Sequence, residues 1–395
     1  MASESIQPVN RSTFQPQGQL ALETREQIQR YGPITFARFM SLALYHPQLG
    51  YYSSGRCSIG RGGDYFTNVS VGFLFGMLLA RQFAEIWETL GRPDDFVIVE
   101  QGAHQGEFAA DVLDALRARH PEFFTRVLYR IVEPFPILRE RQEERLQKFG
   151  TRVQWVADLD EMPPFVGVHF SNELLDAMPV HLLVAADNGA EREWQARLVD
   201  FNESGFVFIT RPISDSKLCQ RLTTLPAPPA EDYETEINLA ALDWIETLSR
   251  KLERGVVLIA DYGLPRDQFY APDRISGTLQ AYAKHRALPT CFENIGECDL
   301  SAHVEWTSLA ERAAEFGLTI VGFADQHHFL TGLLSTYPEL ASAATEKSRA
   351  LQTLIHPELL GTKFQFLGLA KNFPPNSSLG GFKFARDSRQ HLGLD

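Results

Sequence analysis

The stretch Phe96–Gly106 reads FVIVEQGAHQG, and it decides the fold class. Its first part is a run of apolar, largely β-branched residues, and its second part is a glycine-containing turn that leads into the helical pattern FAADVLDALRARH. A strand that ends in such a turn lets backbone amides and a helix N-terminus approach a polar ligand closely. The stretch therefore predicts the first strand, turn and helix of a nucleotide-binding α/β fold.

Further apolar runs follow at intervals, with helical patterns between them. They are LYRIVEP at 128–134, VQWVA at 153–157, VHFSNE at 168–173 and VVLIADYG at 256–263. Runs that are apolar throughout, with helices between them, indicate a parallel sheet covered on both faces. Two later runs, near Ile320 and Phe366, are candidates for the strands that close the far edge of the sheet.

Several segments lie outside this alternation. Residues 20–44 carry apolar side chains at helical spacing. Between the fourth and fifth strands the residues alternate with period two, with Asn188-Gly189 as a hairpin turn, which predicts a small β insertion. A helix is expected at 239–252, with Gly255 as its C-terminal stop.

Composition excludes some classes of protein. The chain has 395 residues and a formal net charge of −13, which argues against a broad nucleic-acid-binding surface. Four scattered cysteines without CxxC spacing predict neither a disulfide framework nor a metal site. The first 20 residues lack the apolar core of a signal peptide, and no apolar run is long enough to span a bilayer. We expect a cytoplasmic protein without membrane insertion.

The turn and the end of the second strand together suggest a cofactor. The pattern G-A-H-Q-G is not the GxGxxG of dinucleotide binders, and two glycines in such a loop can be purely steric. Glu133 ends the second strand, where a carboxylate can accept both hydroxyls of a ribose or can simply be solvated. With Glu100 these residues favour a nucleoside cofactor without a pyrophosphate, which points to S-adenosylmethionine rather than NAD.

The fourth strand ends in SNELLDAMPVH, which places Asn172, Glu173 and Asp176 at the carboxyl edge of the sheet. Ligands of open α/β sheets bind at that edge. Glu173 and Asp176 are three residues apart and can hold a cationic group, although carboxylates there can equally cap a helix. These three residues are the candidate catalytic residues.

At this point the chain resembles the MidA-type methyltransferases, a family that includes a mitochondrial complex I assembly factor. The resemblance spans most of the chain and consists of short motifs in a shared order. They are FARFMSLALYHPQLGYYSS, GGDYFT at 62–67, VIVEQG-xxx-G at 97–106, NELLDAMPV at 172–180, INLAALDWIETLSRKLERGVVLIADYG at 237–263, RISGTLQAYAKHR at 274–286, GECDLSAHVEW at 296–306 and QHHFL at 326–330.

The resemblance implies a Rossmann-like class I methyltransferase fold with a seven-stranded, mostly parallel sheet. Residues 1–20 are polar and rich in Gln, Ser and Pro, and we expect a disordered tail there. N-terminal helices and a cofactor-side loop would follow at 21–92, and the core at 93–395. The core would carry the β insertion at 181–232 and a helical lid within 264–316. The cofactor residues implied are Gly63, Asp64, Thr67, Glu100, Gly102, Gly106 and Glu133, with Asp158 as an adenine contact by position and Asn172 and Glu173 near the sulfonium.

Two departures from the family pattern bear on activity. Ala103-His104-Gln105 fills the middle of a turn that is usually E-L-G-P-G-x-G in the family, and Asn68-Val69 stands where a Pro-Glu pair is usual. A side chain at His104 would cost space or demand an unfavourable φ. The leading hypothesis is an S-adenosylmethionine-dependent methyltransferase that acts on a protein, with an arginine side chain as the candidate acceptor. The alternatives are a methyltransferase-like scaffold with weakened cofactor binding and a nicotinamide enzyme.

Overall fold

The central sheet arises from the apolar runs of the sequence. The computed structural model describes residues 18–56, 67–187, 192–283, 286–345, 347–375 and 377–394, and within these ranges this sheet has eight strands. Seven of them lie in the order β15-β16-β10-β5-β2-β3-β4, and the two-residue strand β14 (Val304–Glu305) pairs with β10. The seven are β2 (Phe96–Gln101), β3 (Leu128–Val132), β4 (Val153–Val156), β5 (Phe165–Asn172), β10 (Leu252–Leu264), β15 (Thr319–Asp325) and β16 (Phe364–Lys371).

The direction of the strands confirms the predicted fold class. Strands β4, β3, β2, β5 and β10 pair in parallel, whereas β16 runs antiparallel to both β10 and β15. The two late apolar runs thus close the far edge of the sheet, as the sequence predicts. The result is a Rossmann-like, mostly parallel sheet in which the carboxyl ends of β3, β2, β5 and β10 meet at one edge.

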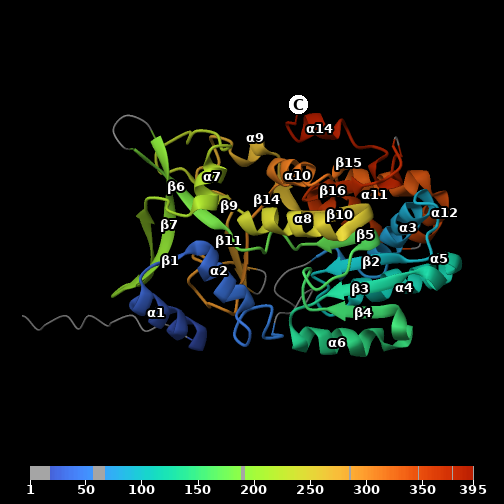
Figure 1. Cartoon of the computed structure of the whole chain (residues 1–395), viewed down its shortest axis with the longest axis horizontal. Helices are drawn as coiled ribbons and strands as arrows, with labels where there is room; N and C mark the ends of the chain where they lie inside the picture. The colour runs from blue at the N-terminus through green and yellow to red at the C-terminus, as the bar shows by residue number, and fades with distance from the viewer. Residues whose placement is uncertain are drawn as a thin grey trace, which may run out of the picture.

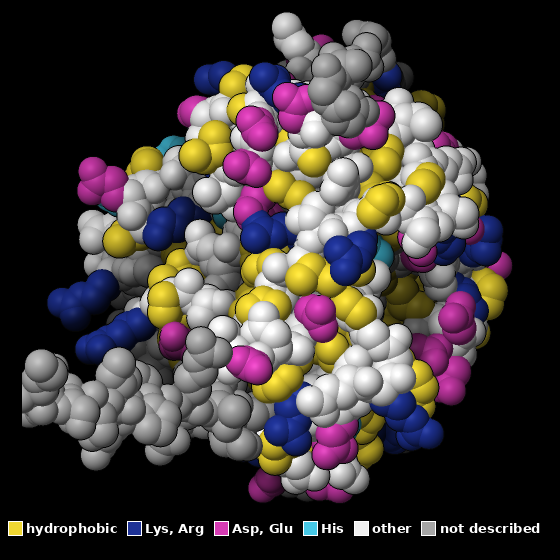
Figure 2. Space-filling model, turned by 90° about the vertical axis from the view of Figure 1, so that its left-hand side faces the viewer, with side chains coloured by type: hydrophobic (Ala, Val, Ile, Leu, Met, Phe, Trp, Pro, Cys, Tyr) yellow, Lys and Arg dark blue, Asp and Glu magenta, His cyan; other side chains and the backbone are white. Residues whose placement is uncertain are grey.

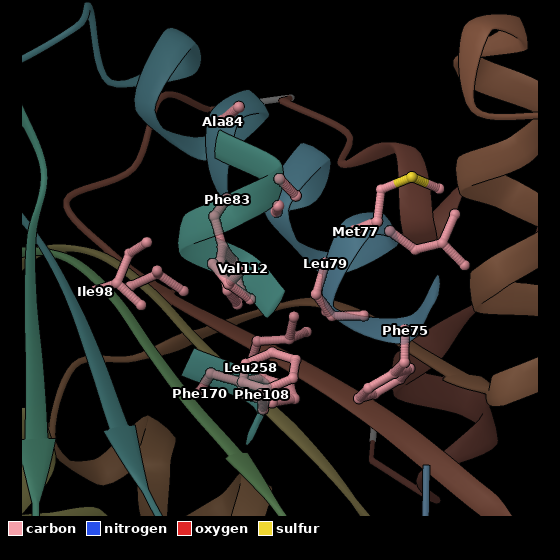
Figure 3. Packing of buried hydrophobic residues seen from close by; sticks show 14 of the residues in the cluster. Phe75, Met77, Leu79, Phe83, Ala84, Ile98, Phe108, Val112, Phe170 and Leu258 are labelled. Atoms are coloured by element: carbon pink, nitrogen blue, oxygen red, sulfur yellow. The ribbon is translucent and has the colours of Figure 1, made fainter. Parts of the chain in front are cut away.

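Helices cover both faces of this sheet (Figure 1). Side chains of β2 alternate between two cores, with Ile98 in one and Val99 in the other. The first core contains α3 (Leu74–Thr89), α4 (Glu107–Arg119) and α11 (Gln326–Thr336), and the second contains α8 (Leu239–Lys251) and α10 (Trp306–Glu315). Figure 3 shows the first core, where the rings of Phe108 and Phe170 stack with centroids 4.6 Å apart.

The other helices are shorter or lie at the edges of the molecule. They are α5 (Pro121–Arg126), α6 (Pro136–Leu146), α7 (Ser216–Leu222), α9 (Arg266–Phe269), α12 (Pro338–Thr345), α13 (Ser348–Ile355) and α14 (Ser388–His391). Among the described residues, none of the helices combines the length and the apolar character that a membrane span requires.

A second sheet lies beside the first and is labelled at the left of Figure 1. Its strands run in the order β1-β7-β6-β9, with β8 paired to β7. They are β1 (Ile34–Thr35), β6 (His181–Asp187), β7 (Arg192–Asn202), β8 (Gly205–Arg211) and β9 (Glu234–Ile237). Strands β6 and β7 form the predicted antiparallel pair, but its Asn188-Gly189 turn lies outside the described residues. Figure 2 shows this side of the molecule, with charges of both signs interspersed among apolar groups.

The N-terminal segment joins this second sheet. The helical spacing of residues 20–44 is divided between α1 (Gln19–Tyr31) and α2 (Phe36–Tyr45), because Gly32 adopts a φ of +88° and ends α1. The expected disordered tail falls on residues 1–17, outside the described ranges, except that α1 already begins at Gln19. The domain boundaries themselves stay a prediction.

The expected helical lid is wrong in its secondary structure. Within 264–316 the strands β11 (Gln280–Ala283), β12 (Arg286–Ala287) and β13 (Asp299–Ser301) form an antiparallel sheet. The reason is a period of two: Ala281 and Leu300 are buried against α2, whereas Gln280 points outward and is exposed. Among the described residues of this segment, the α-helices are α9 and α10, and both lie outside 274–305.

The expected role of Gly255 as a helix stop is also wrong. Helix α8 ends at Lys251, and Gly255 lies inside β10 with a φ of +142°. A Cβ atom there would meet the carbonyl oxygen of Gly167 at 1.8 Å, and one on Gly167 would meet that of Val97 at 1.9 Å. These glycines therefore let three parallel strands approach closely where they begin.

One polar side chain in the sheet is buried without a hydrogen-bond partner among the described residues. His169 on β5 is fully buried, its ring packs edge-on against Trp244, and neither ring nitrogen has a hydrogen-bond partner among the described residues. Burial lowers the pKa of His169 to about 3. The unfolded chain therefore binds a proton below pH 6.5 that the folded chain refuses, and this residue costs stability as the pH falls.

We predict that His169→Phe becomes more stabilising as the pH falls from 7.5 to 5. The penalty of the buried imidazole is absent above its unfolded pKa and reaches about 2 kcal/mol at pH 5. Thermal unfolding of both proteins across this range measures the difference. A difference in Tm between the two proteins that stays constant from pH 7.5 to 5 would contradict the assignment.

Candidate functional site

A cavity of about 580 Å³ opens at the carboxyl edge of the parallel strands. Residues that follow β2, β3 and β5 line it, together with Thr67, Val69 and Ser70 from the segment before α3. Its volume lies within the range of roughly 300–1,000 Å³ that is usual for cofactor and ligand pockets. The predicted candidate residues therefore gather around one cavity because parallel strands end at the same edge.

The turn after β2 forms one wall of the cavity. Gly102, His104 and Gly106 have φ values of +81°, +47° and +82°, so alternate residues are left-handed. The sequence leaves open whether His104 costs space or an unfavourable φ, and the structure shows the latter. Its side chain lies beside Glu107, with Nδ1 and Oε2 3.9 Å apart. The turn thus keeps the shape of a glycine loop although a histidine occupies its centre.

Glu133 lines the cavity at the end of β3, the strand next to β2. Its Oε1 accepts a hydrogen bond of 3.0 Å from the backbone N–H of Phe135, and its Oε2 accepts one of 2.8 Å from Nε2 of Gln142. Burial raises the pKa of Glu133 to about 7, although both hydrogen bonds lower it. Each carboxylate oxygen keeps a lone pair for a further donor, such as a hydroxyl of a ribose.

Asn172 and Glu173 line the cavity at the end of β5. Nδ2 of Asn172 donates to Oε1 of Glu173 at 2.7 Å, and Oδ1 of Asn172 accepts from Asn68 at 2.9 Å. Glu173 has a φ of +55°, a strained conformation that clusters at functional sites. Burial raises the pKa of Glu173 well above its usual range, and the nearby Asp261 and Asp299 raise it further.

Comparisons with known proteins agree with this geometry. Residues 78–324, more than half of the chain, match the family described as "Putative S-adenosyl-L-methionine-dependent methyltransferase". The chain belongs to this methyltransferase family. A Burkholderia thailandensis protein solved with S-adenosyl-homocysteine bound is 32% identical, with a TM-score of 0.82 over 94% of this chain and 96% of that one.

Named relatives point in the same direction. The Drosophila melanogaster homolog of "Protein arginine methyltransferase NDUFAF7, mitochondrial" is 27% identical over 89% of this chain and 85% of the relative. The human protein of that name is 25% identical over 92% of this chain and 85% of the relative. Since these relatives are mitochondrial proteins, they overturn the expected cytoplasmic location.

The methyltransferase uses S-adenosylmethionine, which confirms the predicted cofactor and enzyme class. The cavity suits this cofactor because it combines a buried carboxylate that retains free lone pairs with a turn that exposes backbone groups. The scaffold and the nicotinamide alternatives are not favoured, since the family match and the relative with bound S-adenosyl-homocysteine both indicate methyl transfer.

Glu100, at the end of β2, is buried at the floor of the methyltransferase cavity. The hydroxyl of Tyr129 donates a hydrogen bond of 2.6 Å to its Oε2. Burial raises the pKa of Glu100 to about 8, and the neighbouring Glu107 and Glu133 add to the shift, whereas the Tyr129 hydrogen bond lowers it. A cationic group of a ligand would stabilise the ionised form of this carboxyl.

Asp261 supports the methyltransferase site from behind. Its Oδ2 accepts hydrogen bonds from the backbone N–H groups of Leu174 and Leu175 at 3.1 and 2.8 Å, and its Oδ1 accepts one from Tyr262. Burial raises the pKa of Asp261 to about 7, and these backbone N–H groups lower it. Asp261 on β10 therefore holds the turn after β5, and with it the strained backbone of Glu173.

Aromatic residues also line the cavity. Tyr45 stacks on Tyr52 and on Phe135, with ring centroids 5.7 and 6.3 Å apart. The hydroxyl of Tyr45 donates to the carbonyl of Ala177 at 2.8 Å, and that of Tyr52 donates to Oδ1 of Asp299 at 2.7 Å. These contacts attach the N-terminal segment and the three-stranded sheet to the methyltransferase core.

The structure brings together most of the predicted site residues. Those that line the cavity are Thr67, Glu100, Gly102, Glu133, Asn172 and Glu173, and Gly106 ends the turn. Gly63 and Asp64 lie outside the described residues. Two others do not line the cavity. Asp158 is exposed and caps its own turn through Glu161, and Asp176 is buried among Glu173, Asp261 and Asp299.

Sequence reasoning missed several residues of the site. Tyr45, Tyr52 and Phe135 line the cavity, and Gln142 contacts Glu133 from α6. Tyr45 and Tyr52 lie within the family motif of the N-terminal segment. The motif marked this segment as part of the resemblance but did not indicate that its tyrosines line the cavity. Gln142 had no signal of its own, because it lies in a helix of alternating charges.

We predict that Asp261→Ala destabilises the protein by about 3 kcal/mol, since buried backbone N–H groups of the turn lose their acceptor. The matched control is Asp325→Ala, which removes a partly buried carboxylate that caps α11 through His328 and should cost about 1 kcal/mol. Thermal unfolding compares the two variants. Equal shifts in Tm would show that Asp261 does not support the turn.

Proposed function

We propose that this methyltransferase transfers the methyl group of S-adenosylmethionine to an arginine side chain of a protein. The relatives named as protein arginine methyltransferases support an arginine substrate. The observation that carries the proposal is Glu173, a half-buried carboxyl group that lines the cavity and lies near other acids. Such a group gains most from a cation, and a planar guanidinium can bind a carboxylate through two hydrogen bonds.

The cofactor would lie along the turn and Glu133. Glu133 would accept the ribose hydroxyls, and Gly102 and Gly106 would let the backbone approach the cofactor. Glu100 would face its cationic end from the floor of the cavity, and Thr67 would close the cavity from the segment before α3. The apolar side chains of Val132 and Leu138 lie near Glu133 in the lining and would pack against the adenine. Asp158 is exposed and is given no role.

The acceptor would enter at the acidic end of the cavity. The bound cofactor supplies an electrophilic methyl group. The arginine nitrogen would form its bond to that methyl group while the methyl–sulfur bond breaks and the neutral thioether leaves. The nitrogen would also give up a proton, and Glu173, held ionised by the bound guanidinium, is placed to accept it. Asn172 would orient Glu173 through the hydrogen bond between them, while Asp176, whose pKa burial raises well above its usual range, would lie behind Glu173 among the same acids. Most of the rate enhancement would come from holding the two reactants in line.

The binding of the ribose at Glu133, which we call the ribose seat, can be tested by the pH dependence of cofactor affinity. A protonated Glu133 cannot accept both hydroxyls, so affinity for S-adenosylhomocysteine should rise as the pH increases through about 7. We expect Glu133→Gln to lower this affinity at pH 8 by about tenfold to a hundredfold. Calorimetry from pH 6 to 8 measures the affinity of both proteins for S-adenosylhomocysteine. The titration of the ligand itself cancels in the ratio of the two affinities. A ratio that stays flat with pH would rule out this seat.

The acceptor can be tested with radiolabelled S-adenosylmethionine and a protein extract, followed by hydrolysis and amino-acid analysis. Label in methylarginine is expected, and label in another amino acid would overturn the arginine proposal. We expect Glu173→Gln to lower the rate by at least about a hundredfold, because the proton loses its acceptor. Its affinity for S-adenosylhomocysteine should change by no more than about threefold. An active Glu173→Gln variant would remove Glu173 from the mechanism.

A further inference from the structure

Gln142 connects two separate parts of the cofactor site. It lies on α6, which follows β3, and its side chain is fully buried. Its Nε2 donates one hydrogen bond of 2.8 Å to Oε2 of Glu133 and another of 2.8 Å to the backbone carbonyl of His104. One primary amide thus joins the carboxylate at the end of β3 to the centre of the turn that follows β2.

The orientation of this amide is fixed by a third contact. Nε1 of Trp155, on β4, donates a hydrogen bond of 2.9 Å to Oε1 of Gln142. An indole nitrogen can only donate, and the carbonyl of His104 can only accept, so the two ends of the amide cannot be exchanged. The Nε2 of Gln142 therefore faces Glu133 and the turn, with both of its N–H groups engaged.

The backbone of the turn also packs against α6. Gly106 has a φ of +82°, and a Cβ atom added there would contact Leu146 and Gln142 at 3.4 and 3.5 Å. His104 has a left-handed backbone that a non-glycine residue adopts only when its surroundings hold it. The hydrogen bond from Gln142 to the carbonyl of His104 is such a restraint, at the position where histidine replaces the middle glycine of the family turn.

We propose that Gln142 is a positioning residue for methyl transfer, which fixes the carboxylate of Glu133 relative to the turn of His104 and so sets the register of the cofactor. It acts through these two groups and needs no contact with the cofactor itself, in agreement with its absence from the cavity lining. The inference rests on the proposed seat of the ribose at Glu133, and it does not depend on the identity of the methyl acceptor.

The test compares S-adenosylhomocysteine with its 2′-deoxy analogue by calorimetry. The wild-type protein should prefer the hydroxylated ligand by about tenfold or more, since a well-oriented carboxylate accepts that hydroxyl. Gln142→Met keeps the length of the side chain but removes all three hydrogen bonds. We expect it to weaken binding of S-adenosylhomocysteine by about tenfold and to reduce the preference to about twofold. A purely structural role would lower Tm and leave the preference unchanged.

Two further variants complete the experiment. Gln142→Glu keeps the acceptor for Trp155 but offers at most one proton to Glu133 and His104. Its preference for the hydroxylated ligand should therefore fall between those of the wild type and Gln142→Met. Arg145→Met is the matched control on the same helix. Nε of Arg145 donates to the neighbouring carbonyl of Gln105 at 2.8 Å, and its guanidinium pairs with Glu107 but makes no contact with Glu133. Its preference should equal that of the wild type.

The outcomes separate this inference from the proposal on which it rests. Loss of the preference in Glu133→Gln and in Gln142→Met, but not in Arg145→Met, supports the positioning role. If Glu133→Gln loses the preference and Gln142→Met keeps it, the ribose seat stands and the role of Gln142 is wrong. If Glu133→Gln keeps the preference, the ribose seat itself fails. Equal losses in Arg145→Met and Gln142→Met would also overturn the role of Gln142.

Discussion

The carboxyl ends of β3, β2, β5 and β10 meet at one edge of the sheet because these strands are parallel, and the rest of the site depends on this constraint. Polar residues that follow the strands are thereby buried together. Each then needs a partner, since a buried polar group without one costs free energy. Asp261 meets this need for the turn after β5, and Gln142 meets it for Glu133 and the turn after β2.

The same constraint brings several carboxyl groups together where they are shielded from water, so their mutual repulsion is only weakly screened. Glu100, Glu133, Glu173 and Asp261 all have a raised pKa, and in each case burial is the largest cause. Such a site is held ready for hydroxyl and cationic ligands, because each of them stabilises the charged form of a carboxyl group. A nucleoside that carries a sulfonium, and a guanidinium as its acceptor, have that chemistry.

Much of the fold could be read from local pattern. The apolar runs around Ile98, Ile131 and Ile259 lie in the central sheet, and the late runs near Ile320 and Phe366 close its edge. Local pattern gave a wrong prediction where a glycine could serve either of two structural roles. Gly255 satisfies the description of a helix stop, yet it lies in β10 where the backbone of Gly167 approaches. Gln280–Ala283 and Asp299–Ser301 are strands, because a neighbouring core buries Ala281 and Leu300 at alternating positions.

The sequence by itself determined the parallel sheet, the turn at Gly102 and Gly106 and the acidic end of β3, because strand propensity, glycine conformation and chain order act over a few residues. Only the tertiary structure decided that Asp176 lies outside the cavity lining, that Asp261 holds the turn of Glu173, and that Gln142 joins Glu133 to His104. These contacts connect residues far apart in the chain, so they exist only once the strands have been ordered and packed.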